Sequence, residues 1–354
     1  MSGQARGAAP MIARGLLRTA EPLYAGAMRL RNWLFDSSLC SVAKLPRPVI
    51  SIGNITTGGT GKTPMVRWLA ERLRGSGRQM AILSRGYRAS GAGPGDELTM
   101  LNQLLNYEDR RPEVRVRANP DRFAAGQSLL RDHPETDLFL LDDGFQHRRL
   151  ARDFDLVLIN AAEPFGFGHV LPRGMLREPL TGLRRADAVV ISHADQVSPE
   201  KLLQIESEIR RYHPNIPVYK AIHAQIGLRE STPPGSAPAN RSLTELSRTR
   251  FFAFCGIGNP ASFDRQLARF GEGYAGHRWF SDHYEYRPSD LQKLHDSARQ
   301  AGAHVLVTTE KDWVKVAALE NHDRFPIWRI DIGLQFLETG EEELFHQIEQ
   351  AIAK

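Results

Sequence analysis

The chain has 354 residues, of which 41% are hydrophobic and 25% charged, and this composition favours a globular protein of about two domains with a real core. Its two cysteines, Cys40 and Cys255, exclude a disulfide framework and suit a reducing compartment. The net charge of +5 suits nucleic acid, anionic lipid or a phosphorylated substrate. Since we find no nucleic-acid-binding motif, the prediction is acidic lipid or phosphate and no nucleic acid.

Residues 1–47 differ from the rest of the chain. Arginines alternate with aliphatic and aromatic residues up to Trp33, Leu34 and Phe35. No apolar run approaches the ~20 residues of a membrane span, and we find no signal-peptide core. The pattern predicts an amphipathic helix, broken or kinked at Pro22. Such a helix either lies on a membrane surface or covers the core, and we favour the membrane.

A glycine-rich segment follows the apolar run 48–52. It reads Gly-Asn-Ile-Thr-Thr-Gly-Gly-Thr-Gly-Lys-Thr-Pro at 53–64 and predicts a strand, a phosphate-binding turn and a helix start. Lys62 is expected to reach the β- and γ-phosphates, and the Thr63 hydroxyl to ligate Mg²⁺. The strict pattern has glycine where Thr56 stands. The predicted nucleotide-binding residues are Thr56, Thr57, Gly58, Gly59, Thr60, Gly61, Lys62 and Thr63.

Short apolar runs alternate with amphipathic stretches along the next part of the chain. Strands are predicted at 49–52, 80–83, 114–116, 138–141, 156–159, 188–191 and 218–221, with helices that include 65–74 and 122–131. This alternation predicts an α/β fold of the P-loop NTPase type, with a mostly parallel sheet and helices on both faces. Ligands of such sheets lie at the carboxyl ends of the strands.

Four domains or segments are expected from these patterns. Residues 1–47 form the N-terminal amphipathic segment and 48–230 the P-loop nucleotide-binding domain. Residues 231–250 begin with a run rich in proline and serine that is typical of a linker. Residues 251–354 form a second, smaller α/β lobe, with strands at 251–254 and 304–308 and a polar loop at 277–288.

Acidic and basic residues follow several of the predicted strands. The run 138–141 leads into Asp142 and Asp143, the expected Mg²⁺-binding acids opposite the P-loop. Arg85 follows the strand at 80–83 and suits a phosphate contact. Asp96 and Glu97 follow a glycine-rich stretch, and on the bare sequence a solvated turn is the better interpretation. A surface residue is likewise the better interpretation of His283.

Several segments in the same order resemble the tetraacyldisaccharide 4′-kinase family, the lipid A 4′-kinases of Gram-negative bacteria. The resemblance spans about residues 11 to 335. Each of its segments alone is weak evidence for the family, but together they are hard to obtain by chance. They are 53–64, Leu83-Ser-Arg-Gly-Tyr87, Gly95-Asp-Glu97, Asp142-Asp-Gly-Phe-Gln-His147, 171–179, Gly256-Ile-Gly-Asn-Pro260, Asp282-His-Tyr284 and Thr309-Glu-Lys-Asp312.

The resemblance implies transfer of the ATP γ-phosphate to the 4′-hydroxyl of a tetraacyldisaccharide 1-phosphate, which forms lipid IV-A. It also implies an N-terminal helix associated with the cytoplasmic face of the bacterial inner membrane. ATP, the lipid substrate and the membrane surface are therefore the expected partners, and Mg²⁺ the expected cofactor.

The same resemblance assigns roles to individual residues. Asp96 would be the base that takes the sugar hydroxyl proton, assisted by His283, and this reverses the interpretation from the bare sequence. Glu97, together with Asp142 and Asp143, would act around Mg²⁺. The expected substrate or phosphate contacts are Asn54, Arg85, Tyr87, Arg122, Gln146 and His147.

The chain departs from the family pattern at two places, and two other protein classes compete with it. Leu98 replaces a proline, and Arg173 and Met175 replace alanine and proline, which puts loop rigidity and substrate contacts there in doubt. A partitioning-type or metallochaperone-type ATPase would need its signature lysine at Thr57. A GTP-dependent switch would need a guanine-specifying Asn-Lys-x-Asp, which neither 192–195 nor 309–312 provides.

Overall fold

The structure is a computed structural model that describes residues 8–86, 101–102, 105–106, 113–230, 240–258, 260–282, 284–317, 319 and 324–353. The chain divides into two compact units. The first comprises Met1–His223 and Leu334–Lys354, and the second Ala224–Gly333. The backbone passes from one unit to the other within β7 (Val218–Glu230) and returns within β12 (Ile327–Phe336).

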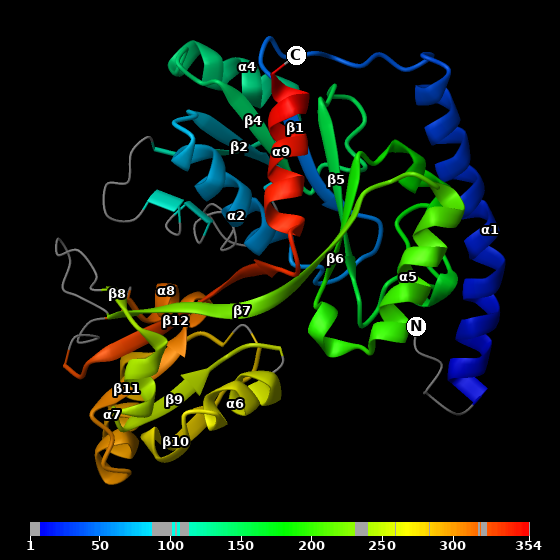
Figure 1. The fold of residues 1–354 in the computed structure, drawn as a ribbon. Helices are drawn as coiled ribbons and strands as arrows, with labels where there is room; N and C mark the ends of the chain where they lie inside the picture. Colours follow the sequence, from blue (N-terminus) through cyan, green and yellow to red (C-terminus); the bar gives the residue numbers. More distant parts are fainter. Residues whose placement is uncertain are drawn as a thin grey trace. The chain divides into compact units, whose positions relative to one another are not determined.

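The first unit contains a parallel sheet in the order β7-β6-β5-β1-β4-β2-β3 (Figure 1). Its remaining strands are β1 (Val49–Asn54), β2 (Met80–Ser84), β3 (Arg115–Ala118), β4 (Leu138–Asp142), β5 (Phe154–Asn160) and β6 (Ala188–Ser192). β1 lies between β4 and β5, so the P-loop emerges at the centre of the sheet. The α/β fold class and the mostly parallel sheet are confirmed.

Alternate residues of these strands pack on opposite faces of the sheet, which is why their apolar runs are nearly continuous. On one face, β-strand side chains such as Ile50 pack with α2 (Lys62–Gly75) and α9 (Gly340–Ile352). On the other face, Phe139 packs with α4 (Arg122–Asp132), and Val157 packs with α5 (Pro199–Tyr212). Helices therefore cover both faces, as predicted.

The second unit has its own parallel strands in the order β10-β9-β11-β12. These are β9 (Phe251–Cys255), β10 (Tyr274–Trp279) and β11 (Val305–Thr309), while β8 (Asn240–Arg241) pairs antiparallel with β7. α7 (Pro288–Gln300) and α8 (Glu310–Ala317) pack on one face, and α6 (Pro260–Ala268) packs on the other. Short 3₁₀ turns connect elements of both units at Gly166–Gly168, Leu180–Arg185, Ala194–Gln196, Leu243–Ser247 and Gly271–Gly273.

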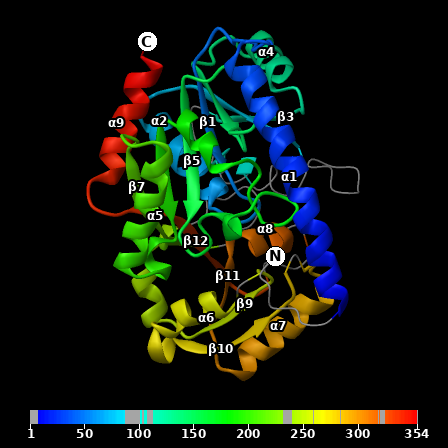
Figure 2. The same ribbon diagram turned by 90° about the vertical axis from the view of Figure 1, so that its right-hand side faces the viewer.

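The N-terminal helix, α1, runs from Ala8 to Asp36 and continues through Pro22 (Figure 2). The interruption predicted at Pro22 is therefore wrong: proline removes one backbone donor, and here the helix continues past it. The alternative, a kink at Pro22, stays a prediction. No helix in the described part of the chain is long and apolar enough to cross a membrane.

The structure divides the chain differently from the sequence-based domain boundaries. Residues 334–354, expected in the second lobe, belong to the first unit because Leu344 and Ile348 of α9 pack against Leu69 of α2. Part of the expected linker 231–250 is packed as well, since Leu246 is buried in the core of the second unit. The polar loop expected at 277–288 begins instead with the last residues of β10.

Candidate active site

The first half of the P-loop is held in an extended conformation by the segment that precedes β6. The Thr57 amide donates to the Met175 carbonyl at 2.7 Å, and the Arg177 amide donates to the Ile55 carbonyl at 2.8 Å. Thr56 forms a β-bridge within this pairing and does not have a positive φ angle. This extended backbone does not require glycine, which explains why threonine is tolerated at the position of the missing glycine.

The second half of the loop is fixed by side chains at the carboxyl ends of three strands. Asn54 of β1 donates to the Thr60 hydroxyl at 3.0 Å. Ser192 of β6 donates to the Thr60 carbonyl at 2.9 Å, and Asn160 of β5 donates to the Gly59 carbonyl at 3.0 Å. A loop that presents its N–H groups to an anion must direct its carbonyl groups elsewhere, and these bonds serve that purpose.

Gly61 is the residue at which the loop turns into α2. Its φ of 80° and ψ of 27° are left-handed, and a Cβ there would lie 2.5 Å from Nε2 of His223. Only glycine fits both constraints. No side chain caps the start of α2, so the positive end of the helix is left for an anion beside Lys62 and Thr63, its first two residues.

Asp143 is the charged residue that faces Lys62. It follows β4, with a left-handed φ of 51°. Its carboxylate lies 3.6 Å from the Lys62 ammonium and accepts two hydrogen bonds of 2.8 Å from Arg177. Burial alone would raise the pKa of Asp143, but Lys62 and Arg177 outweigh that effect and lower it below the usual value. The carboxylate is therefore ionised at neutral pH.

Asp142 is the last residue of β4, in register with Ile52 of β1. It accepts a 3.4 Å hydrogen bond from Ser84 of β2. The parallel pairing of β4 with β1 brings both acids to the edge of the sheet where the P-loop begins, as the sequence predicted. Among the residues that the structure describes, no group of three or more His, Cys, Asp or Glu side chains could hold a metal by itself. A carboxylate pair with a nearby threonine nevertheless fits Mg²⁺, which usually keeps waters and substrate phosphates as ligands.

A basic pocket of about 600 Å³ adjoins Asp143. Its charged and polar lining comes from several elements and includes most of the predicted phosphate or substrate contacts. These lining residues are Arg31, Arg85, Arg122, Asp143, Gln146, His147, Arg148, Arg149 and Arg177. The concentration of guanidinium groups suits an acceptor that itself carries phosphate.

Gln146 and His147 both line this pocket, and the structure describes the surroundings of each. The Gln146 side-chain amide donates to the Asn54 carbonyl at 2.9 Å and to Glu178 at 3.0 Å, so it ties elements of the site together. Burial, then the charges of Arg122 and Arg152, lower the pKa of His147 to about 4. His147 is therefore neutral at pH 7 and adds no positive charge to the pocket.

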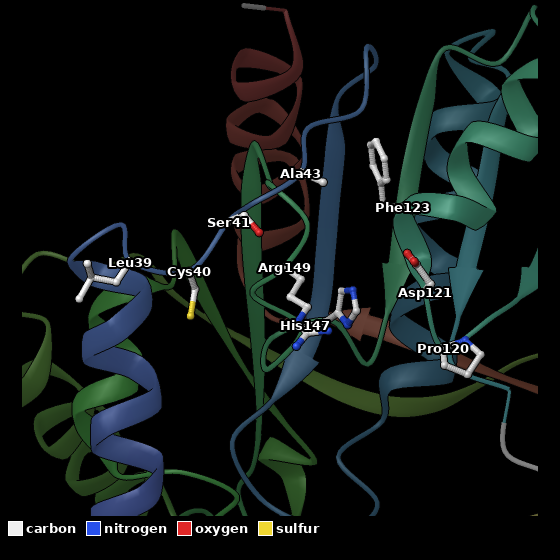
Figure 3. Close-up of a pocket in the computed structure, with 9 residues that line it drawn as sticks. All are labelled: Leu39, Cys40, Ser41, Ala43, Pro120, Asp121, Phe123, His147 and Arg149. Carbon is white, nitrogen blue, oxygen red and sulfur yellow. The ribbon is translucent and has the colours of Figure 1, made fainter.

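A second pocket, of about 680 Å³, shares His147 and Arg149 with the basic pocket. Figure 3 shows these two side chains between the segment that follows α1, with Leu39 and Cys40, and the start of α4, with Phe123. The apolar residues of its lining are Leu39, Ala43, Pro120 and Phe123, and Leu39 is exposed. The two pockets also share Cys40 and Pro120, so these apolar side chains lie beside the basic pocket.

Some residues of the site had not been assigned a role from the sequence. Glu178 is fully buried and accepts hydrogen bonds from Gln146, Asn32 and Arg185. Its motif segment, 171–179, was recognised, but spacing alone gave Glu178 no function. Asn160 and Ser192 each stand at the end of an apolar strand run, a position that could have marked them as loop-holding residues.

Other predicted site residues lie outside the described part of the chain. They are Tyr87, Asp96, Glu97 and His283. Their roles remain predictions.

The comparisons with known proteins agree with this geometry. The family model described as tetraacyldisaccharide-1-P 4′-kinase matches residues 13–353. Proteins named tetraacyldisaccharide 4′-kinase are similar to the chain. The one from Halothermothrix orenii is 37% identical and aligns over 85% of this chain and 82% of its own. The one from an Anaeromyxobacter species is 38% identical and aligns over 90% of this chain and 86% of its own.

A solved structure gives the same result. The structure of LpxK from Aquifex aeolicus in complex with ATP matches with a TM-score of 0.71 and 28% identity, and covers 96% of this chain and 99% of that one. This family match decides against the partitioning-type ATPase and the GTP-switch interpretations. The chain belongs to the tetraacyldisaccharide-1-phosphate 4′-kinase family of ATP-dependent kinases in lipid A biosynthesis.

Proposed function

We propose that this protein transfers the γ-phosphate of ATP to the 4′-hydroxyl of tetraacyldisaccharide 1-phosphate and so forms lipid IV-A. The observation that carries the proposal is one continuous arrangement at the edge of the sheet. An uncapped helix start with Lys62 lies beside Asp143, and Asp143 lines a basic pocket with Arg31 of α1. This arrangement would bring the donor phosphate, the acceptor phosphate and a helix with apolar side chains on its outer face to one place.

In this reaction the protein's main task is to position the phosphates and balance their charge. Lys62 contacts the β- and γ-phosphates, while Arg177 stays hydrogen-bonded to Asp143 and holds that carboxylate in place. Thr63, Asp142, Asp143 and Glu97 would hold Mg²⁺, which supplies neutralisation of the phosphate charge. The donor set of hydroxyl and carboxylate oxygens fits that ion.

The acceptor hydroxyl must lose a proton as it attacks. Asp96 is the proposed base, assisted by His283, and both assignments rest on the family resemblance. The basic pocket, with Arg85, Arg122 and His147 in its lining, is the proposed place of the acceptor's sugar and phosphate groups. Asn54 instead supports the P-loop through Thr60.

The lipid acceptor would stay in the membrane while its headgroup reaches the site. Leu23, Leu30 and Trp33 of α1 are 77%, 56% and 55% exposed and follow a helical spacing along the outer face. Such a surface, flanked by arginines, suits peripheral binding at the cytoplasmic face of the inner membrane.

The direct test is transfer of label from γ-³²P-ATP to tetraacyldisaccharide 1-phosphate in detergent micelles. Wild type should yield a labelled bis-phosphorylated lipid. Lys62→Ala should lose about 10²- to 10³-fold of the turnover, the usual effect of removing one preorganised charge-stabilising donor. ATP hydrolysis by wild type without any labelled lipid would overturn the proposal.

A further inference from the structure

Three side chains on the inner face of α1 donate hydrogen bonds to residues 146, 177 and 178, which lie around the active-site acid. The Tyr24 hydroxyl donates to the Arg177 carbonyl at 2.8 Å, and Asn32 donates to Glu178 at 2.8 Å. Arg31 donates to the backbone carbonyl of Gln146. Positions 24, 31 and 32 are seven and eight residues apart, so they share one face of the helix.

One of these three residues holds Asp143 directly, and the other two join the segments on either side of it. The Arg177 guanidinium donates two hydrogen bonds to the Asp143 carboxylate. Gln146 joins the end of β1 to Glu178 through its side-chain amide. Glu178 is fully buried and also accepts two 2.9 Å hydrogen bonds from Arg185.

A buried carboxylate needs all of its donors, because an unsatisfied charge in a low-dielectric site is costly. Asn32 supplies one of the donors to Glu178, so its loss would change how Glu178 and Gln146 are held. Glu178 is next to Arg177 in the chain, and Gln146 is three residues after Asp143. A displacement of Glu178 or Gln146 would therefore be passed on to Asp143, the acid that faces Lys62.

We propose that Tyr24, Arg31 and Asn32 are positioning residues for phosphoryl transfer, so that the N-terminal helix is part of the active-site support as well as the proposed membrane contact. The inference rests on the proposed kinase function. The two faces of α1 then have different roles. The outer face binds lipid, and the inner face holds the Arg177–Asp143 pair in its geometry.

The test measures turnover in detergent micelles, where the lipid acceptor is supplied without a bilayer. Tyr24→Phe and Asn32→Ala should each lower kcat with little change in KM for ATP and no change in binding to anionic phospholipid vesicles. The expected loss for Asn32→Ala is about 10- to 100-fold, the scale of a displacement of about 1 Å in a reacting geometry. Asn32→Asp should be worse than Asn32→Ala, because it sets a second carboxylate beside buried Glu178.

Glu21→Ala is the matched control. Glu21 also joins α1 to the first unit, through hydrogen bonds of 2.9 Å to His169 and to Arg173, but it does not contact residues 146, 177 or 178. It should lower the melting temperature of the protein without lowering kcat in micelles. Thermal unfolding of every variant shows which losses reflect folding, and Tyr24→Phe, which removes only one oxygen, keeps the test valid if Asn32→Ala is unstable.

The two proposals fail in different ways. If wild type transfers label and the folded Tyr24→Phe and Asn32→Ala proteins keep its kcat, the positioning role is wrong and the kinase function stands. An equal loss of kcat in Glu21→Ala would also overturn the positioning role, because any loosening of α1 would then suffice. If wild type transfers no label to the lipid, the kinase function itself fails.

Discussion

Individual residues of the site are held by opposing charges and by close backbone approach. Asp143 is shared between Lys62 and Arg177, and the lowered pKa of its carboxyl keeps the negative charge that this pairing needs. Lys62 is at 3.6 Å from Asp143, a longer contact than the 2.8 Å bonds of Arg177. The lysine is thus the more weakly held of the two cations, which suits a side chain that must move to a phosphate.

The turn at Gly61 gives a prediction with a matched control. Gly61→Ala places a Cβ 2.5 Å from His223 at a φ of 80°, whereas Gly77→Ala has the same φ and no atom within 4 Å. Both variants should lose about 1–2 kcal/mol from the left-handed backbone. Only Gly61→Ala should lose more than this and also weaken ATP binding, as measured by thermal unfolding with and without ATP. Equal effects of the two substitutions on ATP binding would contradict this account of the loop.

His147 gives a prediction about pH. Its pKa of about 4 in the folded protein lies below the ordinary value of 6.5, so the unfolded chain binds more protons between these values. The stability that neutral His147 contributes is complete above about pH 6.5 and is lost as the pH falls towards 4. The melting temperature of wild type should therefore fall more steeply between pH 7 and 4.5 than that of His147→Gln. Parallel curves would show that His147 is not the group responsible.

At the scale of elements, α1 has two different faces. Its inner face carries the hydrogen bonds to Gln146, Arg177 and Glu178, and its outer face carries exposed apolar side chains. An ordinary core-covering helix would bury its large apolar residues, whereas Leu23 and Leu30 remain in solvent. The outer face therefore supports the membrane interpretation over the core-covering one.

The outer face can be tested by removing apolar surface without touching the active site. A buried leucine contributes about 1.5–3 kcal/mol to partition from water, so Leu23→Gln combined with Leu30→Gln should weaken binding to anionic phospholipid vesicles by at least about 10-fold. Leu203→Gln is the control, because Leu203 is 63% exposed but lies on α5. Vesicle sedimentation measures the binding of the double variant and of the Leu203→Gln control. A double variant that binds vesicles like wild type would exclude this face as the membrane contact.

Elements with a strong local pattern were predictable, and those defined by long-range packing were not. β1, β2 and nearly all of β4 are buried, so their apolar runs and the P-loop between β1 and α2 could be predicted from the sequence. β10 is an edge strand with exposed positions and lacks that signal. The position of the two acids at the end of β4 was predictable because the carboxyl ends of parallel strands meet at one edge of the sheet. The buried network of Glu178 depends on contacts from residue 32 to residue 185, which spacing along the chain cannot show.

At the scale of the whole molecule, the chain order and the units do not coincide. The chain enters the second unit within β7 and returns to the first within β12, so its last helix completes the nucleotide-binding unit. Ile348 of α9 is fully buried in the same cluster as Met65 and Leu69 of α2, the helix that begins at the P-loop. The C-terminal residues thus support the nucleotide-binding unit rather than the lobe that precedes them in sequence.

This arrangement predicts where a core substitution in α9 acts. Ile348→Ala should cost about 2–5 kcal/mol and speed hydrogen exchange in β1 and α2. Leu294→Ala, equally buried but on α7, should speed exchange in β9 and β11 instead. Hydrogen-exchange mass spectrometry of the two variants separates the units. Faster exchange confined to the second unit in Ile348→Ala would contradict the placement of α9.

In the proposed reaction the phosphate passes to the 4′-hydroxyl of the lipid, so an acceptor without that hydroxyl is the decisive substrate to compare. We would measure ADP release with tetraacyldisaccharide 1-phosphate and with its 4′-deoxy analogue, in the same micelles and at the same ATP concentration. We expect ADP release and a bis-phosphorylated product with the natural acceptor, and neither with the analogue. Equal ADP release with both lipids would contradict it, because the protein would then hydrolyse ATP or phosphorylate another position.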